Sequence, residues 1–276
     1  MNRYGKKDQE FKKKVIESIV KHPPLSSAFF RITYNENDIK TILDFFKDNL
    51  DVLIDIYINA LEKNNYIDYD GKLFYKIFEQ QPKIWDKYIK WIQQHIYQEG
   101  NEKYIFELIW TVKEYQRYID DAYEILIENN LFITENLVKL LFSESKNKDI
   151  LNRKKSWLLN KLHKTSMDIE KCKKLIYVVV VAMPDWKLEF ILEFLKENQN
   201  VNDFTKLTLF PSMTFWSGSK IPIILEKIDF LQSLKNSLKG IDYLDHKRYL
   251  DEIIRNLNSY KEEVEKQEYL ASEYYA

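Results

Sequence analysis

The chain has 276 residues, of which 45% are hydrophobic and 31% are charged, and its formal net charge is −1. This composition is typical of a globular protein with a real core and argues against a disordered chain. Five glycines and six prolines are too few for the turns of an all-β sandwich or the glycine-rich loops of an α/β nucleotide-binding fold. The near-neutral charge also argues against a non-specific nucleic-acid binder, because such proteins usually carry a basic excess.

Cysteine content and hydropathy indicate a soluble protein of a reducing compartment. Cys172 is the single cysteine, so neither an intramolecular disulfide nor a cysteine-based zinc site can form. Residues 1–14 lack the apolar segment of a signal peptide, and the longest apolar run, residues 175–183, is too short to cross a bilayer. We therefore expect a cytoplasmic protein that does not associate with membranes.

In chain order, apolar residues recur with the i, i+3, i+4, i+7 spacing of amphipathic helices. The stripes are Ile39, Ile42, Leu43 and Phe46; Leu50, Leu53, Ile54, Tyr57 and Leu61; Trp85, Tyr88, Ile89, Ile92 and Ile96; Ile105, Leu108, Ile109 and Val112; and Ile119, Tyr123 and Leu126. Residues 175–183 contain four consecutive valines, but the polar pattern leading into them favours a helix over a buried strand. Residues 25–34 have a mixed pattern that is compatible with a short extended segment.

Residues that commonly start or end helices stand at the expected places. Thr134, Asn35 with Asp38, and Thr165 with Asp168 are candidate N-terminal caps, while Pro82, Pro184 and Pro222 suit a first helical turn and Gly240 suits a helix end. The pattern predicts about ten to twelve helices of roughly 10–20 residues.

The predicted fold class is all-α. Helix pairs recur at roughly 35–45 residues, the spacing of HEAT repeats, which favours a HEAT-like α-solenoid of helical hairpins over the alternative, a compact multi-helix bundle. Residues 199–220 form an unusually long connection, and such connections are often functional. We therefore divide the chain into a helical-repeat body, residues 1–198, and a long loop with a C-terminal hairpin, residues 199–276, packed on the body as one continuous array.

The residues that could support catalysis or metal binding are sparse. The histidines, His22, His95, His163 and His246, have no metal-ligand spacing, so we expect no metal and no cofactor. Asp242 and His246 stand one helical turn apart and could form an acid–base pair, but no nucleophile accompanies them, and Asp242 also suits a helix cap while His246 suits local hydrogen bonding. Gly218-Ser219-Lys220 lacks the upstream glycine of a P-loop, and Ser217 or Ser219 is better explained as a cap.

Tryptophans and a carboxylate at helical spacing offer one further enzymatic hypothesis. Trp110 and Glu114 lie one turn apart, and Trp186 lies on a later helix. Aromatic residues beside an acid are similar to the base-binding surface of helical-repeat DNA glycosylases. Tryptophans at this spacing more often belong to the core, and base recognition would also require a phosphate-binding surface.

The last 60–90 residues contain Phe215-Trp216-Ser217-Gly218-Ser219, Ile221-Pro222, Phe230-Leu231, Asp242-Tyr243-Leu244, His246 and Arg248. With these residues they resemble the C-terminal helical-repeat end of large bacterial proteins with a STAND-type NTPase core, found in defence systems. It implies a helical sensor or scaffold. The chain carries no NTPase motif, so no catalytic residue can be transferred from that family.

From these observations we predict a non-enzymatic scaffold or sensor module that binds a protein partner on an aromatic-rich surface. The predicted contact residues are Phe215, Trp216, Lys220, His246 and Arg248. The alternative is a helical-repeat protein that binds nucleic acid through a local basic groove, which includes the glycosylase hypothesis. A purely structural subunit would have the same sequence features as the scaffold.

Overall fold

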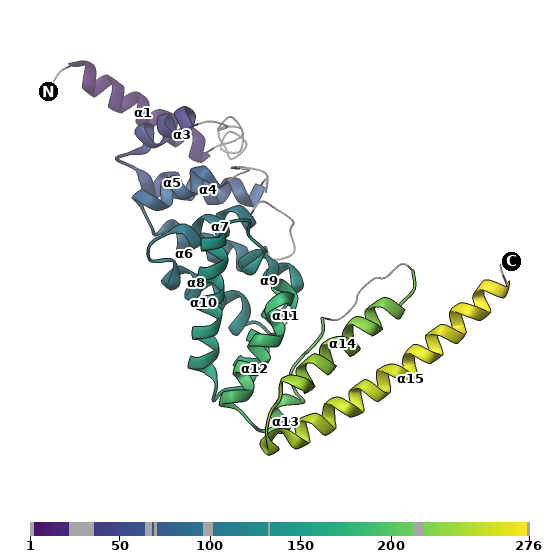
Figure 1. Ribbon diagram of the computed structural model, residues 1–276. Coiled ribbons are helices and arrows are strands. Elements are labelled where there is room, and N and C mark those ends of the chain that lie inside the picture. Colours follow the sequence, from purple (N-terminus) through teal and green to yellow (C-terminus); the bar gives the residue numbers. More distant parts are fainter. Residues whose placement is uncertain are drawn as a thin grey trace. The chain divides into compact units, whose positions relative to one another are not determined.

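The computed structural model describes residues 3–21, 36–63, 68, 71–95, 102–131, 133–211 and 218–274 (Figure 1). Over these residues the chain forms fourteen α-helices, three short 3-10 or π segments and no strand, which confirms the predicted all-α class. The number of helices exceeds the predicted ten to twelve because short turns divide some periodic segments. Residues 47–49, for example, separate the helix that ends at Phe46 from the helix that begins at Leu50. The ambiguous residues 25–34 and the predicted cap Asn35 lie outside the described residues.

The chain folds into two compact units, Met1–Ile150 and Leu151–Ala276. The predicted boundary between residues 198 and 199 falls inside the second unit. It stays a prediction about how that unit is organised internally.

In the first unit, helices pack against the next helix and the next but one. The helices are α1 (Arg3–Lys21), α3 (Glu36–Phe46), α4 (Leu50–Lys63), α5 (Lys72–Gln80), α6 (Ile84–Gln94), α7 (Glu102–Thr111), α8 (Tyr115–Tyr123) and α9 (Glu135–Phe142), with a π-helical turn, Glu124–Glu128, after α8. Contacts join α3 to α4 and α5, α4 to α6, α5 to α6 and α7, and α7 to α8 and α9. Figure 1 shows these helices following one another along the unit in chain order.

Aromatic rings fill the core of this unit. Phe74 on α5 contacts Tyr57, Phe78, Trp85 and Tyr88 at ring-centroid distances of 6.0, 6.3, 6.5 and 4.7 Å. These five side chains are at most 4% exposed and come from three helices. The helices are therefore held together by contacts between rings, and Tyr57, Trp85 and Tyr88 are among the apolar positions that the sequence pattern identified.

A buried carboxylate starts helix α5. Asp68, which is 6% exposed, accepts hydrogen bonds from the Tyr57 hydroxyl at 2.9 Å and from the backbone amides of Leu73 and Phe74 at 2.9 and 2.7 Å. Gly71 follows with a φ of 69°, and a β-carbon there would lie 2.9 Å from a side-chain carbon of Ile105. The charged acceptor and the glycine together fix the entry of the chain into α5.

The second unit begins within α10 (Lys148–Thr165). It continues with α11 (Ile169–Ala182), a 3-10 turn (Pro184–Trp186), α12 (Lys187–Glu197), the short α13 (Val201–Phe204), α14 (Ile221–Ser237), a second 3-10 turn (Ile241–Tyr243) and α15 (Leu244–Tyr274). The valine-rich run is helical, as predicted, and lies in α11. It forms a helix because its apolar side chains are packed on several sides, including against α12.

Two of the predicted caps are observed. The Thr134 hydroxyl accepts from the Leu137 amide at 3.4 Å, and the Asp168 carboxylate accepts from the amides of Glu170 and Lys171 at 3.1 and 3.2 Å. Thr165, in contrast, lies at the end of α10, where its hydroxyl donates to the Lys161 carbonyl at 2.8 Å. Pro222 occupies the first turn of α14, as predicted, whereas Pro82 precedes the first residue of α6.

Helices α14 and α15 form an antiparallel hairpin (Figure 1). Ile224, Ile228, Leu231 and Leu234 of α14 are buried, and so are Leu250, Ile254 and Val264 of α15. Spacings of three and four residues place the α14 set on one helix face, and Leu250 and Ile254 lie one turn apart on α15. An ion pair between Lys235 and Asp251 sets the register of the two helices.

The Asp68 network makes a stability prediction. Asp68→Ala removes the acceptor of three hydrogen bonds and should lower the free energy of unfolding by roughly 2–3 kcal/mol. Urea denaturation followed by circular dichroism measures this change. Asp44→Ala, at an exposed carboxylate on the neighbouring α3, is the matched control and should change stability by less than about 0.5 kcal/mol. Equal effects of the two substitutions would contradict the capping role.

Candidate functional site

The structure separates the predicted contact residues that it describes. Lys220 is exposed at the residue before α14, and Arg248 is exposed on the second turn of α15. The 17 residues of α14 span about 25 Å and lie between them, so they do not form one patch. Phe215 and Trp216 lie outside the described residues, and their role stays a prediction.

His246 is buried at the joint between α15 and the helices that precede the hairpin. Its side chain is 1% exposed, and its ring centroid lies 5.4 Å from that of Phe204 on α13 and 5.6 Å from that of Tyr243. Tyr249 contacts Phe204 edge-on at 5.9 Å, and the Tyr243 hydroxyl donates to the Leu195 carbonyl at 3.4 Å. These rings fasten the start of α15 to α12 and α13.

The predicted pair of Asp242 and His246 is not formed. Neither ring nitrogen of His246 has a hydrogen-bond partner among the described residues. Asp242 lies in the 3-10 turn that precedes α15, so the helical spacing on which the prediction depended does not apply. The expectation that local hydrogen bonds satisfy His246 is wrong, because neither ring nitrogen has a partner among the described residues. Burial lowers the pKa of His246, and the nearby Asp245 carboxylate raises it to a smaller extent.

A second polar group, Lys187, is enclosed by aromatic rings at the first residue of α12. Its Nζ lies 3.7 Å from the ring centroid of Phe230 and 4.7 Å from that of Phe210, and the two rings meet edge-on at 5.7 Å. Burial lowers the pKa of Lys187, while the carboxylate of Glu226 opposes the change. The ring faces attract the ammonium group, so this contact holds the described end of the long connection, at Phe210, against α12 and α14.

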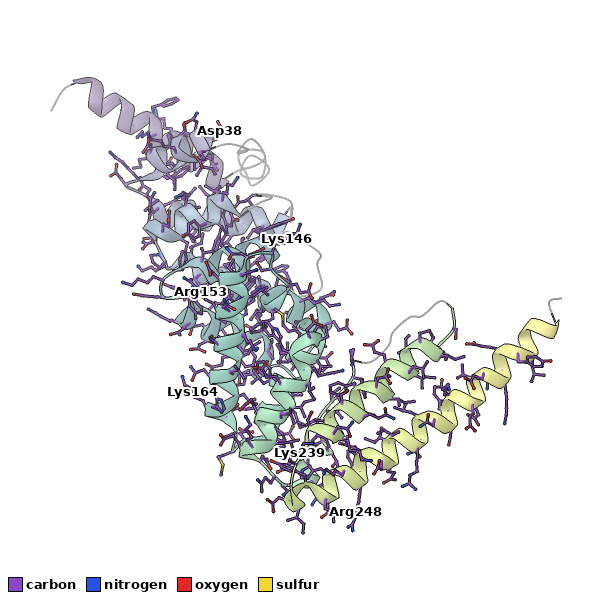
Figure 2. The ribbon with its side chains drawn as sticks, viewed as in Figure 1. Asp38, Lys146, Arg153, Lys164, Lys239 and Arg248 are labelled. Atoms are coloured by element: carbon purple, nitrogen blue, oxygen red, sulfur yellow. The ribbon has the colours of Figure 1, made fainter. Side chains whose placement is uncertain are left out.

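The tip of the C-terminal hairpin exposes apolar side chains. Ile241 is 82% exposed and Leu244 is 46% exposed. Lys239 and Arg248 flank them on either side of the turn (Figure 2). Arg248 forms an ion pair with Asp245 at 3.1 Å, and its side chain remains 72% exposed. We call Lys239, Ile241, Leu244 and Arg248 the hairpin tip.

The sequence pattern predicts partner contacts at His246 and Arg248, which belong to this part of the chain. It predicts no contact at Ile241, Leu244 or Lys187. The exposed apolar pair could have been noticed next to Gly240, since a turn is a surface position. No sequence signal could have found Lys187, because its ring partners are more than twenty residues away along the chain.

The tryptophans of the glycosylase hypothesis do not form a described base-binding surface. Trp110 is fully buried, and its indole N–H donates to the Leu141 carbonyl at 3.0 Å. Trp186 is half-buried in the second unit, where its ring stacks on that of Phe190 with centroids 6.4 Å apart. Trp110 is therefore a core residue of the first unit, which was the simpler interpretation of its spacing.

The prediction that Ser217 or Ser219 caps a helix can be compared with the structure at Ser219. The Ser219 hydroxyl accepts a hydrogen bond from the Ile221 amide at 3.2 Å, as expected for a residue that caps a helix start. Ser217 lies outside the described residues.

The most basic helix of the second unit pairs with acidic residues of the same unit. Residues 151–165 on α10 contain five lysine or arginine side chains and no carboxylate. Lys155 pairs with Glu189 at 2.6 Å, and His163 lies 3.7 Å from Glu197, both glutamates being on α12. The charge excess of α10 is thus partly neutralised within the unit.

The described residues contain no group of three or more His, Cys, Asp or Glu side chains arranged to hold a metal ion. None of the described helices combines the length and the apolar character needed to cross a membrane. No family model, curated protein or solved structure matches the chain.

The buried His246 makes the stability of the second unit depend on pH. Its lowered pKa means that the unfolded chain binds the proton more readily than the folded chain. The contribution of neutral His246 to the free energy of unfolding is therefore fully present above the unfolded pKa of about 6.5. This contribution is lost as pH falls through the lower folded pKa. We expect thermal melts to show this loss in the wild-type protein.

The matching substitution is His246→Phe, which should remove that part of the pH dependence and leave stability at pH near 8 unchanged or up to about 1 kcal/mol higher. His163→Gln, at an exposed histidine, is the control and should keep the dependence. A pH profile that is identical in wild type and His246→Phe would contradict the role of burial.

Proposed function

We propose that this chain is a non-enzymatic scaffold or sensor module that binds a protein partner, and that its helices form a HEAT-like α-solenoid. The packing of each helix against the next and the next but one in the first unit supports the solenoid, because repeat arrays make mainly such near-neighbour contacts. A compact bundle would instead bring helices that are distant in the sequence together.

The hairpin tip is the partner-binding surface in this proposal. The observation that carries it is the exposure of Ile241 and Leu244 beside Arg248. Apolar side chains gain free energy when a partner covers them, and arginine is enriched at the centre of protein interfaces. Tyr243 and His246 lie behind the tip and tie it to α12 and α13, so the surface is rigidly supported.

The other predicted contact residues have defined places in the proposal. Lys220 is exposed at the opposite end of α14 and would contact only an extended partner. Phe215 and Trp216 precede Lys220 by five and four residues in the sequence. The resemblance of the last 60–90 residues to the helical ends of STAND-type proteins supports a sensor role and a link to bacterial defence.

The experiment is affinity capture from native-host lysate with a matched set of variants. The wild-type chain should recover a specific protein, and the double variant Ile241→Glu with Leu244→Glu should weaken that interaction at least tenfold, because each glutamate would place a charge in a desolvated interface. Binding of the recovered protein is then measured with purified components.

Met167→Glu is the control, since Met167 is 97% exposed on the connection between α10 and α11. It should bind the partner as the wild type does. A partner that binds the tip variant and the wild type equally would overturn the proposed surface, and circular dichroism establishes that the tip variant is folded.

A second candidate function is binding of nucleic acid through α10. It is favoured by the absence of carboxylates from residues 151–165, and it is opposed by the pairing of α10 with Glu189 and Glu197. Fluorescence anisotropy with duplex DNA and with RNA tests it. Binding that weakens steeply between about 50 and 200 mM salt and is reduced by Lys161→Glu with Lys164→Glu would support this function, and absence of binding at low salt would exclude it.

A further inference from the structure

The first helix of the chain has an apolar face that is only partly covered. Phe11, Val15 and Ile19 are spaced four residues apart on α1 and share one face. Ile19 is 7% exposed and Val15 is half-buried, whereas Phe11 is 66% exposed. The face is therefore packed at its C-terminal end and open at Phe11.

The N-terminal part of this helix has a basic sequence. Residues 3–14 contain six lysine or arginine side chains and two carboxylates, a net charge of +4. Lys13 and Lys14 are exposed next to Phe11, and the Nζ of Lys12 lies 5.5 Å from the ring centroid of Phe45 on α3. We call Phe11, Lys12, Lys13 and Lys14 the basic patch.

The last described helix has the opposite character at its C-terminal end. Residues 262–273 of α15 contain five glutamates and one lysine, a net charge of −4. Tyr269 is 63% exposed and Leu270 is 53% exposed. Glu262 and Glu263 are also exposed, while Glu265 pairs with Lys261 at 3.4 Å. We call Glu262, Glu263, Glu265, Tyr269 and Leu270 the acidic end.

The last two residues of the acidic end extend beyond its partner helix in the hairpin. The pairing of Lys235 with Asp251 places Ile221, the first residue of α14, opposite Glu265 in the antiparallel register. Tyr269 and Leu270 therefore lie past the end of α14, and Figure 1 shows α15 running on beyond it. Within the second unit, α14 does not cover these two side chains, which stay more than half exposed.

We propose that the acidic end of one copy of this chain binds the basic patch of a second copy. The two surfaces carry net charges of equal size and opposite sign, and each adds exposed apolar side chains, Phe11 on one and Tyr269 with Leu270 on the other. Charge complementarity steers and orients association, and the apolar contacts add free energy on burial. This interaction uses residues other than the hairpin tip and does not depend on the proposed scaffold function.

Such a contact joins two different surfaces and is heterologous. Repetition of the contact produces a head-to-tail ring if the rotation closes and an open chain if it does not. The protein should therefore form oligomers whose size increases with concentration. The oligomers should dissociate as salt is raised from about 50 to 500 mM, because the screening length shortens over that range.

The decisive test uses two charge-reversed variants of the full chain. One carries Lys12→Glu, Lys13→Glu and Lys14→Glu, and the other carries Glu262→Lys, Glu263→Lys and Glu265→Lys. Sedimentation velocity should show oligomers for the wild type and at least tenfold weaker self-association for each variant alone. An equimolar mixture of the two variants should form complexes again, because the acidic α1 of the first complements the basic α15 of the second.

Controls and contrary outcomes are defined by the same measurement. A variant with Lys113→Glu, Lys146→Glu and Lys148→Glu reverses three exposed lysines elsewhere in the chain and should associate as the wild type does, and circular dichroism confirms that all variants are folded. A wild type that stays monomeric at every concentration would overturn the proposal, and this includes the case in which the two surfaces pair within one copy. Oligomers that persist in either reversed variant, or a mixture that fails to associate, would overturn it as well.

Discussion

The fold depends on the burial of aromatic side chains between helices that are too short to be stable by themselves. Helices α5, α6 and α8 have 9, 11 and 9 residues, and isolated helices of fewer than about twelve residues are marginal in water. Phe74, Trp85, Tyr88 and Tyr118 join these helices through contacts between rings. Each of these short helices is therefore stabilised by ring contacts with its neighbours rather than by its own backbone hydrogen bonds alone.

Three buried or half-buried polar groups differ in the interactions that offset the free-energy cost of their desolvation. Asp68 is fully engaged, since a hydroxyl and two backbone amides donate to it. Lys187 lies over two phenylalanine rings, whose faces attract its charge. His246 has no hydrogen-bond partner among the described residues and is accommodated as a neutral ring between aromatic neighbours. Asp68 therefore stabilises the start of α5, whereas burial lowers the pKa of His246 and makes its joint sensitive to acid.

Several parts of the described chain expose apolar side chains beside charged ones. Ile241 and Leu244 lie at the turn of a hairpin whose base is fixed by ring contacts, so a partner would meet a rigid tip. Phe11 on α1 is exposed, and Tyr269 with Leu270 lie on the part of α15 that extends past α14. Burial of these side chains by a partner would complete helix faces that the chain leaves partly covered.

The sequence by itself determined the helical class and many of the buried positions, such as Leu53, Trp85 and Ile119. Periodicity is a local property, and side chains three and four residues apart must share a face once the backbone is helical. The valine-rich run in α11 and the caps Thr134 and Asp168 could be predicted for the same reason. Only the tertiary structure decided that His246 is buried without a partner, that Lys187 lies between Phe210 and Phe230, and that α10 pairs with Glu189 and Glu197. Each of these depends on residues more than twenty positions apart, which periodicity cannot bring together.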